Sequence, residues 1–114
     1  MERDLQSLLD MLQSAQIVTD YLQGRSQNEL ATDLQFQDAI IHRLLIIGEA
    51  SKRVSEITRQ TLTAIPWAAI SGMRNRLVHE YDEIDLDVVW DTAVNGLPTL
   101  ILELKNVVPP DKQH

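Results

Sequence analysis

The chain has 114 residues, of which 44% are hydrophobic and only 4% aromatic, with four glycines and four prolines. This length gives room for one domain, and the scarcity of turn residues favours packed helices over a β-sandwich. The absence of cysteine excludes disulfides and thiolate metal sites, and the formal charge of −7 means that any affinity for nucleic acid must come from a local basic site.

The start of the chain predicts a helix over residues 2–22. Its leucines follow the spacing of one apolar helix face: Leu5, Leu8, Leu9 and Leu12. Gly24 and the polar residues 25–29 then end the helix. Charges near the N-terminus argue against a signal peptide, and the longest apolar run, residues 44–47, is too short to cross a bilayer. We therefore expect a cytoplasmic protein without a membrane segment.

A second helix is expected to begin at the capping residues Thr32 and Asp33 and to continue to about Val54. Its apolar side chains lie on more than one side of the helix: Ile40, Ile41, Leu44, Leu45, Ile46 and Ile47. A helix with one solvent-facing side would not need this arrangement. The second helix is therefore either central in the fold or part of a subunit interface.

A third helix is expected from Pro66, which suits a first helical turn, to about Tyr81. A fourth helix starts at Asp85, a good N-cap, and continues as a long apolar stripe. Pro98 interrupts this stripe and should kink the helix just upstream, near residues 95–96.

Two consecutive prolines, at positions 109 and 110, end the last helix. Together these elements predict an all-α protein, an up-and-down bundle of four to five helices. We expect a single helical domain over residues 1–108 and a flexible C-terminal tail over residues 109–114.

The chemically informative segment is Met73–Asp85, with the sequence MRNRLVHEYDEID. At about 100° per residue, one strip of the third helix holds Gly72, Asn75, Arg76 and His79. A second strip, about 140° from His79, holds Arg74 together with Ile70, Leu77 and Tyr81. Because Arg74 shares its strip with apolar residues, it needs an anionic partner, either a carboxylate or a phosphate.

These residue types suit cleavage of RNA without a metal. Histidine gains and loses protons readily near neutral pH, so His79 can act as a general acid or base. Arg74 offers a fork of donors for phosphate oxygens and for the extra charge of the transition state. The pair suits attack of a ribose 2′-OH on its own phosphodiester. Asn75, one turn before His79, is expected to hydrogen-bond the imidazole and fix its tautomer.

The angular offset between Arg74 and His79 also bears on assembly. A single straight helix does not easily bring both side chains to one phosphate. Two copies of the helix related by a two-fold axis could build one shared cleft from both pairs. We therefore expect a homodimer.

The spacing of Arg74 and His79 is a weak signal by itself. The fuller pattern Arg74-Asn75-x3-His79-x-Tyr81 resembles the R-x4-H-x-Y signature of the HepT family within the HEPN superfamily. The flanking sequence resembles that family as well, in residues 38–40, 46–53, 65–67, 72–79, 85–86 and 89–91.

The resemblance implies an all-helical HEPN domain that dimerises with its motifs facing each other. It implies an RNase toxin paired with a nucleotidyltransferase antitoxin, MntA, as in a type VII-like toxin–antitoxin pair. In that family the Arg and His of the motif are catalytic, which carries over to Arg74 and His79, and Asn75 supports them. The motif tyrosine, Tyr81 here, is the residue that the antitoxin adenylylates. No metal and no cofactor are implied.

Several flanking residues allow two interpretations. Arg76, Lys52 and Arg53 are candidate RNA-binding residues, but single basic residues on helices often serve only solubility, and Arg76 could pair with Glu80. Glu49 could orient Arg74 or be an exposed helix carboxylate.

Two further features are also open. The acidic residues Asp82, Glu83, Asp85 and Asp87 resemble a metal cluster, but their position favours capping of the last helix. Gly48 and Ala50 mark either a close helix approach in a dimer or small core positions. The alternative to an RNase is a non-catalytic HEPN module, a scaffold or substrate of a nucleotidyltransferase, which the acidity and Tyr81 would suit.

Overall fold

The computed structural model describes the backbone of residues 2–113 and the side chains of that range except those of Glu2 and Tyr81. Over this part of the chain the secondary structure is helical, with no β-strand. The predicted all-α class is confirmed. No helix in the described range is long and apolar enough to cross a membrane.

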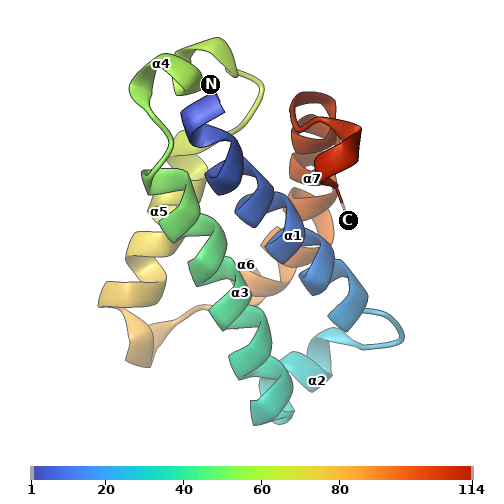
Figure 1. The fold of residues 1–114 in the computed structure, drawn as a ribbon. Helices are drawn as coiled ribbons and strands as arrows, with labels where there is room; N and C mark the ends of the chain where they lie inside the picture. Colours follow the sequence, from blue (N-terminus) through green and yellow to red (C-terminus); the bar gives the residue numbers. More distant parts are fainter. Residues whose placement is uncertain (1, 114) are drawn as a thin grey trace.

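Four longer helices form the body of the bundle: α1 (Leu5–Tyr21), α3 (Leu34–Lys52), α5 (Trp67–His79) and α7 (Leu97–Val107). The helix α3 packs against α1 on one side and α5 on the other, and α7 packs against α1 (Figure 1). The second predicted helix is therefore central in the fold. Its apolar residues face two neighbouring helices of the same chain, which explains why they occupy more than one side.

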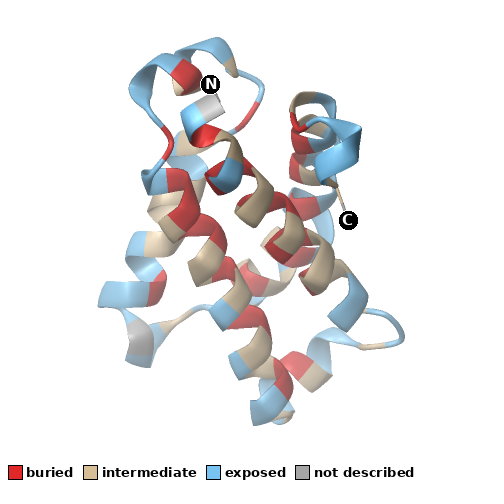
Figure 2. Cartoon of the chain, viewed as in Figure 1, coloured by how far each residue is buried: buried red, intermediate tan, exposed pale blue. Residues whose placement is uncertain are grey.

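The core lies between these helices, as the buried stripes along α1 and α3 show (Figure 2). The fully buried side chains are mainly aliphatic and include Leu8, Met11, Ile40, Leu77 and Leu104. Burial of such side chains is the main favourable contribution to folding.

The predicted helix starts are confirmed at two caps. The side chain of Asp33 accepts a hydrogen bond from Phe36 N at the start of α3. The side chain of Asp85 accepts bonds from Asp87 N and Val88 N at the start of α6 (Leu86–Asp91). Of the two interpretations of the acidic residues 82–87, capping is therefore the one that the structure supports at Asp85.

Two short helices were not expected from the sequence: α2 (Gln27–Thr32) and α4 (Glu56–Thr61). The interpretation of residues 25–29 as only a polar terminator of the first helix is wrong, because Ser26 and Glu29 form a capping box that starts α2. Each short helix buries one side chain, Leu30 in α2 and Thr58 in α4. One buried residue gives no periodicity that a sequence pattern can reveal.

The interruption of the last helix falls where the sequence places it. A π-helical turn, Thr92–Gly96, separates α6 from α7, and Pro98 lies in the first turn of α7. Proline lacks an N–H donor and its ring crowds the preceding turn, so the regular hydrogen-bond ladder cannot run through this position.

Three short 3-10 turns complete the backbone: Glu2–Asp4, Tyr81–Glu83 and Pro110–Lys112. The first turn positions Asp4, which is buried and accepts hydrogen bonds from the backbone N–H and hydroxyl of Ser55 and from the hydroxyl of Thr58. These bonds join the N-terminus to α4. The turn at Pro110 lies within the tail that we expect to be flexible.

Candidate active site

The position of α5 is set by a close approach to α3. A Cβ atom added at Gly48 would lie 2.4 Å from the Cβ of Arg74, which is far inside van der Waals contact. A residue without a side chain is therefore required at position 48 for the observed contact. Gly48 marks a close approach of two helices within one chain, and Ala50 is fully buried in the same core.

A carboxylate on α3 holds the side chain of Arg74. Its Nε donates to Oε1 of Glu49 at 2.8 Å, and only 18% of the Arg74 side chain is exposed. The hydrogen bond from Arg74 is the largest cause that lowers the pKa of Glu49, so this carboxylate remains charged well into the acid range. The prediction that Arg74 needs an anionic partner is confirmed, and Glu49 orients it.

Asn75 contacts the arginine rather than the histidine. Its Oδ1 accepts a hydrogen bond of 3.2 Å from Nη1 of Arg74. Within the described part of the chain no hydrogen bond joins Asn75 to His79, so the expected support of the imidazole is not what the structure shows. The physical reason is that Glu49 holds the guanidinium beside α3, which brings Nη1 within reach of the neighbouring amide.

The guanidinium of Arg74 keeps donors for a ligand. Arginine has five N–H donors in a planar fork. The bonds to Glu49 and Asn75 use two of them, which leaves three. Because both bonds fix the plane of the fork, the remaining donors are directed before a ligand arrives.

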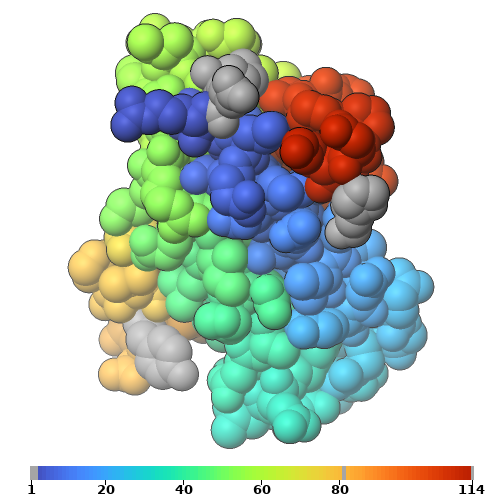
Figure 3. Space-filling model, viewed as in Figure 1, coloured from blue at the N-terminus to red at the C-terminus, as the bar shows by residue number. Residues whose placement is uncertain are grey.

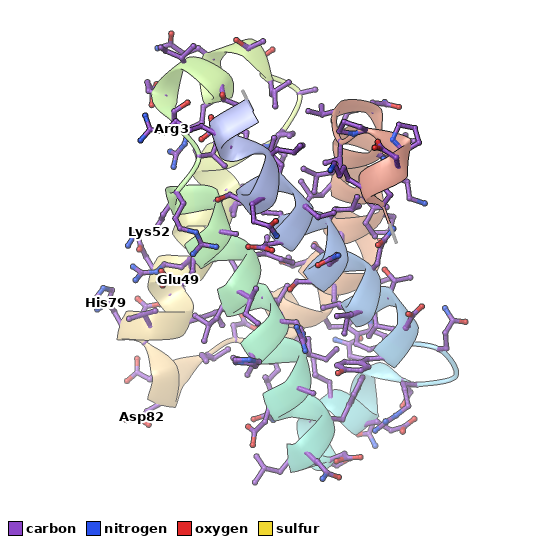
Figure 4. The ribbon with its side chains drawn as sticks, in the orientation of Figure 1. Arg3, Glu49, Lys52, His79 and Asp82 are labelled. Atoms are coloured by element: carbon purple, nitrogen blue, oxygen red, sulfur yellow. The ribbon has the colours of Figure 1, made fainter. Side chains whose placement is uncertain are left out.

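His79 is the last residue of α5 and its side chain is exposed. Figure 4 shows it pointing away from the body of the protein at the end of the helix. A shallow recess beside it is lined by Val78, His79, Glu80, Asp82 and Glu83. Gly72 lies on the same strip of α5 as His79, nearer the N-terminus of the helix. A Cβ added at Gly72 would meet no atom within 4 Å, so the outer face of α5 is uncovered here.

The three candidate RNA-binding residues have different surroundings. Lys52, the last residue of α3, is exposed. Arg53 forms an ion pair of 3.3 Å with Asp10 of α1. Arg76 borders a small recess that also contains acidic side chains, Glu80, Glu83 and Asp85. The expected pair of Arg76 with Glu80 is not among the ion pairs of the described residues.

Tyr81 follows α5 in the 3-10 turn Tyr81–Glu83. Its side chain lies outside the described part of the structure. Among the residues that are described, no group of three or more His, Asp or Glu side chains could together hold a metal ion.

The site thus joins an oriented arginine, an exposed histidine and an intervening asparagine on one helix. A family model described as "Ribonuclease HepT-like" matches residues 11–107, most of the chain. The chain belongs to the HepT-like ribonuclease family. The resemblance of the Arg74–Tyr81 motif and its flanking segments to this family is thereby confirmed.

Similar proteins carry related names. A "Putative RNase" of Methanocaldococcus jannaschii is 32% identical over 107 residues, covering 93% of this chain and 98% of the relative. A "Probable ribonuclease HepT" of Thermococcus cleftensis is 30% identical over 93 residues, covering 82% of this chain and 84% of the relative. No solved structure shows a significant match to this HepT-like chain.

Proposed function

We propose that this chain is a metal-independent endoribonuclease in which Arg74 and His79 carry out the reaction. The observation that supports this most strongly is the pair of hydrogen bonds from Arg74 to Glu49 and Asn75, which fixes the guanidinium and leaves three of its donors for a ligand. A donor fork held in this way matches the oxygens of a phosphodiester. An exposed histidine on the same helix supplies the proton transfer that such a site requires.

In the proposed reaction the ribose 2′-OH attacks its own phosphorus and the P–O5′ bond breaks. The products are a 2′,3′-cyclic phosphate and a free 5′-OH, so one proton leaves the attacking oxygen and another reaches the departing oxygen. His79 acts as the base or the acid for one of these transfers. Arg74 stabilises the charge that grows on the non-bridging oxygens, and Asn75 keeps its guanidinium in place.

A homodimer is part of this proposal. Arg74 and His79 lie about 140° apart around α5, so one copy directs them to different sides of the helix. Two copies facing each other across the outer face of α5 would bring both pairs to one cleft. A chain that remains monomeric at micromolar concentration and still cuts RNA would contradict the shared cleft.

The family membership supports a toxin function in the cytoplasm, in a pair with a nucleotidyltransferase antitoxin of the MntA type. The antitoxin would silence the RNase by adenylylating Tyr81. Tyr81 lies two residues after His79, the last residue of the helix that carries Arg74, so a nucleotide attached there would lie close to His79 and could extend towards Arg74. Its phosphate oxygens would compete for the donors that RNA uses.

The test is an RNA-cleavage assay in the presence of EDTA, with the products examined for 2′,3′-cyclic phosphate ends. Cleavage should persist in EDTA and should be abolished in Arg74→Ala and His79→Ala. Helical content should stay nearly unchanged in both variants, because His79 is exposed and Arg74→Ala keeps the Cβ that contacts α3 at Gly48. Strict dependence on Mg²⁺, or full activity in His79→Ala, would contradict the mechanism.

A second candidate function is a non-catalytic module that serves as scaffold or substrate of a nucleotidyltransferase. The observation that favours it is the acidic surface beside His79, with Glu80, Asp82 and Glu83 around one recess, in a chain with a net charge of −7. Growth arrest on expression of this chain alone, lost in His79→Ala, would favour the enzyme. Normal growth with the intact chain would favour the module.

A further inference from the structure

Three candidate functional side chains, Lys52, Arg74 and His79, follow one another along the contact between α3 and α5. The two helices run antiparallel (Figure 1). Gly48 of α3 lies opposite Arg74 of α5. Lys52 lies one turn beyond Gly48, about 6 Å along the helix axis. His79 lies five residues beyond Arg74 in the opposite direction, about 7.5 Å along α5. Arg74 therefore stands between Lys52 and His79.

The side chains labelled in Figure 4 agree with this order. Figure 4 shows Lys52, Glu49 and His79 one below the other along one edge. In the space-filling view this edge is formed by α5, in yellow to gold, directly beside α3, in green (Figure 3). The three side chains thus lie on one accessible border of the protein.

Lys52 differs from its basic neighbours in the partners around it. Arg53 forms an ion pair with Asp10, and Arg76 borders a recess that contains acidic side chains. Within the described residues Lys52 has no ion pair, and its side chain is exposed at the end of α3. An exposed ammonium that is not held in an ion pair can neutralise a phosphate at little cost.

Its position relative to Arg74 is set by α3 itself. Lys52 follows Glu49 by one helical turn, and Glu49 holds Arg74. After the hydrogen bond from Arg74, the positive charges of Lys52 and Arg53 are among the causes that lower the pKa of Glu49, but of these two only Lys52 is free of an ion pair among the described residues. The spacing of one helical turn places Lys52 within reach of the phosphate next to one bound at Arg74.

We infer that Lys52 binds the phosphate next to the scissile one, on the side of Arg74 that is away from His79. This inference rests on the proposed function. The RNA strand would follow the α3–α5 seam, with its scissile phosphate at Arg74 and the neighbouring phosphate at Lys52. Basic side chains that follow one another along a groove suit a single extended strand, whose successive phosphates also follow one another. Lys52 is thus a positioning residue that fixes the register of the strand.

The experiment measures binding separately from cleavage. The probe is a short fluorescent RNA with 2′-O-methyl riboses, which lack the attacking hydroxyl. Its dissociation constant is measured by anisotropy against salt concentration for the intact chain, Lys52→Gln and Lys52→Arg. The matched controls are Arg53→Gln, next in sequence, and Lys105→Gln, exposed on α7.

The expected result follows from counterion release. Loss of one phosphate contact should reduce the slope of log K against log salt by about 0.7, the value for one contact on a single strand. Lys52→Gln should show this reduction and weaker binding, whereas Lys52→Arg, Arg53→Gln and Lys105→Gln should retain the full slope. In cleavage of ordinary RNA, Lys52→Gln should raise KM and leave kcat nearly unchanged.

Three results would overturn the inference. If the intact chain cleaves RNA but Lys52→Gln binds with the full slope, the strand does not contact Lys52, and the proposed RNase function is unaffected. If the intact chain neither binds the probe nor cleaves RNA, the proposed function fails and the inference fails with it. An equal loss of slope in Arg53→Gln would show a diffuse basic surface instead of a defined register.

Discussion

Glu49 and Arg74 are joined by a hydrogen bond of 2.8 Å that crosses from α3 to α5. Because α3 packs against both α1 and α5, this bond ties the candidate catalytic arginine to a central element of the fold. It also uses the Nε donor of the guanidinium, so that only the Nη donors remain for Asn75 and a ligand. A catalytic group held by a second residue on a rigid element keeps its geometry between turnovers.

Removal of the Glu49 carboxylate should therefore slow cleavage without unfolding the protein. We expect Glu49→Ala to lower kcat by about 10- to 100-fold, because a misplaced guanidinium loses transition-state contacts. Glu49→Gln, which keeps an acceptor oxygen, should retain more activity. Glu56→Gln on the exposed surface of α4 is the control.

The pH dependence of kcat/KM distinguishes orientation of Arg74 by Glu49 from a purely structural role of Glu49. Arg74 lowers the pKa of Glu49, so the carboxylate is charged above its lowered pKa and loses its hold on Arg74 only as the pH falls through it. The acid limb of kcat/KM should thus change in Glu49→Gln. An unchanged profile with unchanged kcat would show that Arg74 needs no support from α3.

The close approach at Gly48 can be tested with a matched pair of glycines. Gly48→Ala places a Cβ 2.4 Å from the Cβ of Arg74, so α3 and α5 must move apart, which should cost about 1–3 kcal/mol. Gly72→Ala meets no atom within 4 Å and should stabilise α5 by about 0.5–1 kcal/mol. Chemical denaturation measures both. Equal stabilities of the two variants would contradict the contact.

The buried Asp4 should make stability depend on pH in the acid range. Hydrogen bonds from Thr58 and Ser55 lower the pKa of Asp4 from 3.8 to about 2. A lowered pKa in the folded state stabilises the protein above about pH 4, and this contribution is lost as the pH falls towards 2. Asp4→Asn should lower the melting temperature at pH 7, and the difference from the intact chain should shrink between pH 4 and pH 2.

The control for this prediction is Asp111→Asn, an exposed carboxylate near the C-terminus. It should melt like the intact chain at neutral pH. A difference between Asp4→Asn and the intact chain that is equal at pH 2 and pH 7 would show that the carboxylate charge of Asp4 does not contribute.

Tyr81 is expected to be the control point of the proposed RNase. Tyr81→Phe should keep RNA cleavage, because the phenol is not needed for proton transfer, and it should escape silencing by the nucleotidyltransferase partner. The intact chain, supplied with that partner and ATP, should gain one or more AMP masses, measured by mass spectrometry. An inactive Tyr81→Phe would place the residue in the catalytic site or the packing, and an active but still silenced variant would place the control point elsewhere.

The amino-acid sequence determined the helical class, the four longer helices, the cap at Asp85 and the place of the break before Pro98. These features depend on local chemistry: periodic apolar side chains, capping carboxylates and the missing N–H of proline. The motif around Arg74 and His79 could also be identified from the sequence, because its residues lie on one helix and keep a fixed spacing. The short helices α2 and α4 were not, since each buries only one residue.

The tertiary structure alone decided how the site is supported. Glu49 and Arg74 are 25 positions apart in the chain, and their contact exists only because Gly48 allows α3 and α5 to touch. With Arg74 held in this way, Asn75 accepts a hydrogen bond from the arginine. Helix spacing alone had predicted a hydrogen bond from Asn75 to His79 instead. The same packing gives the neighbours Lys52 and Arg53 different surroundings, because Arg53 forms an ion pair with Asp10 of α1. Adjacent residues of a helix point in different directions, and only the neighbours that each one meets decide which charge remains available to a ligand.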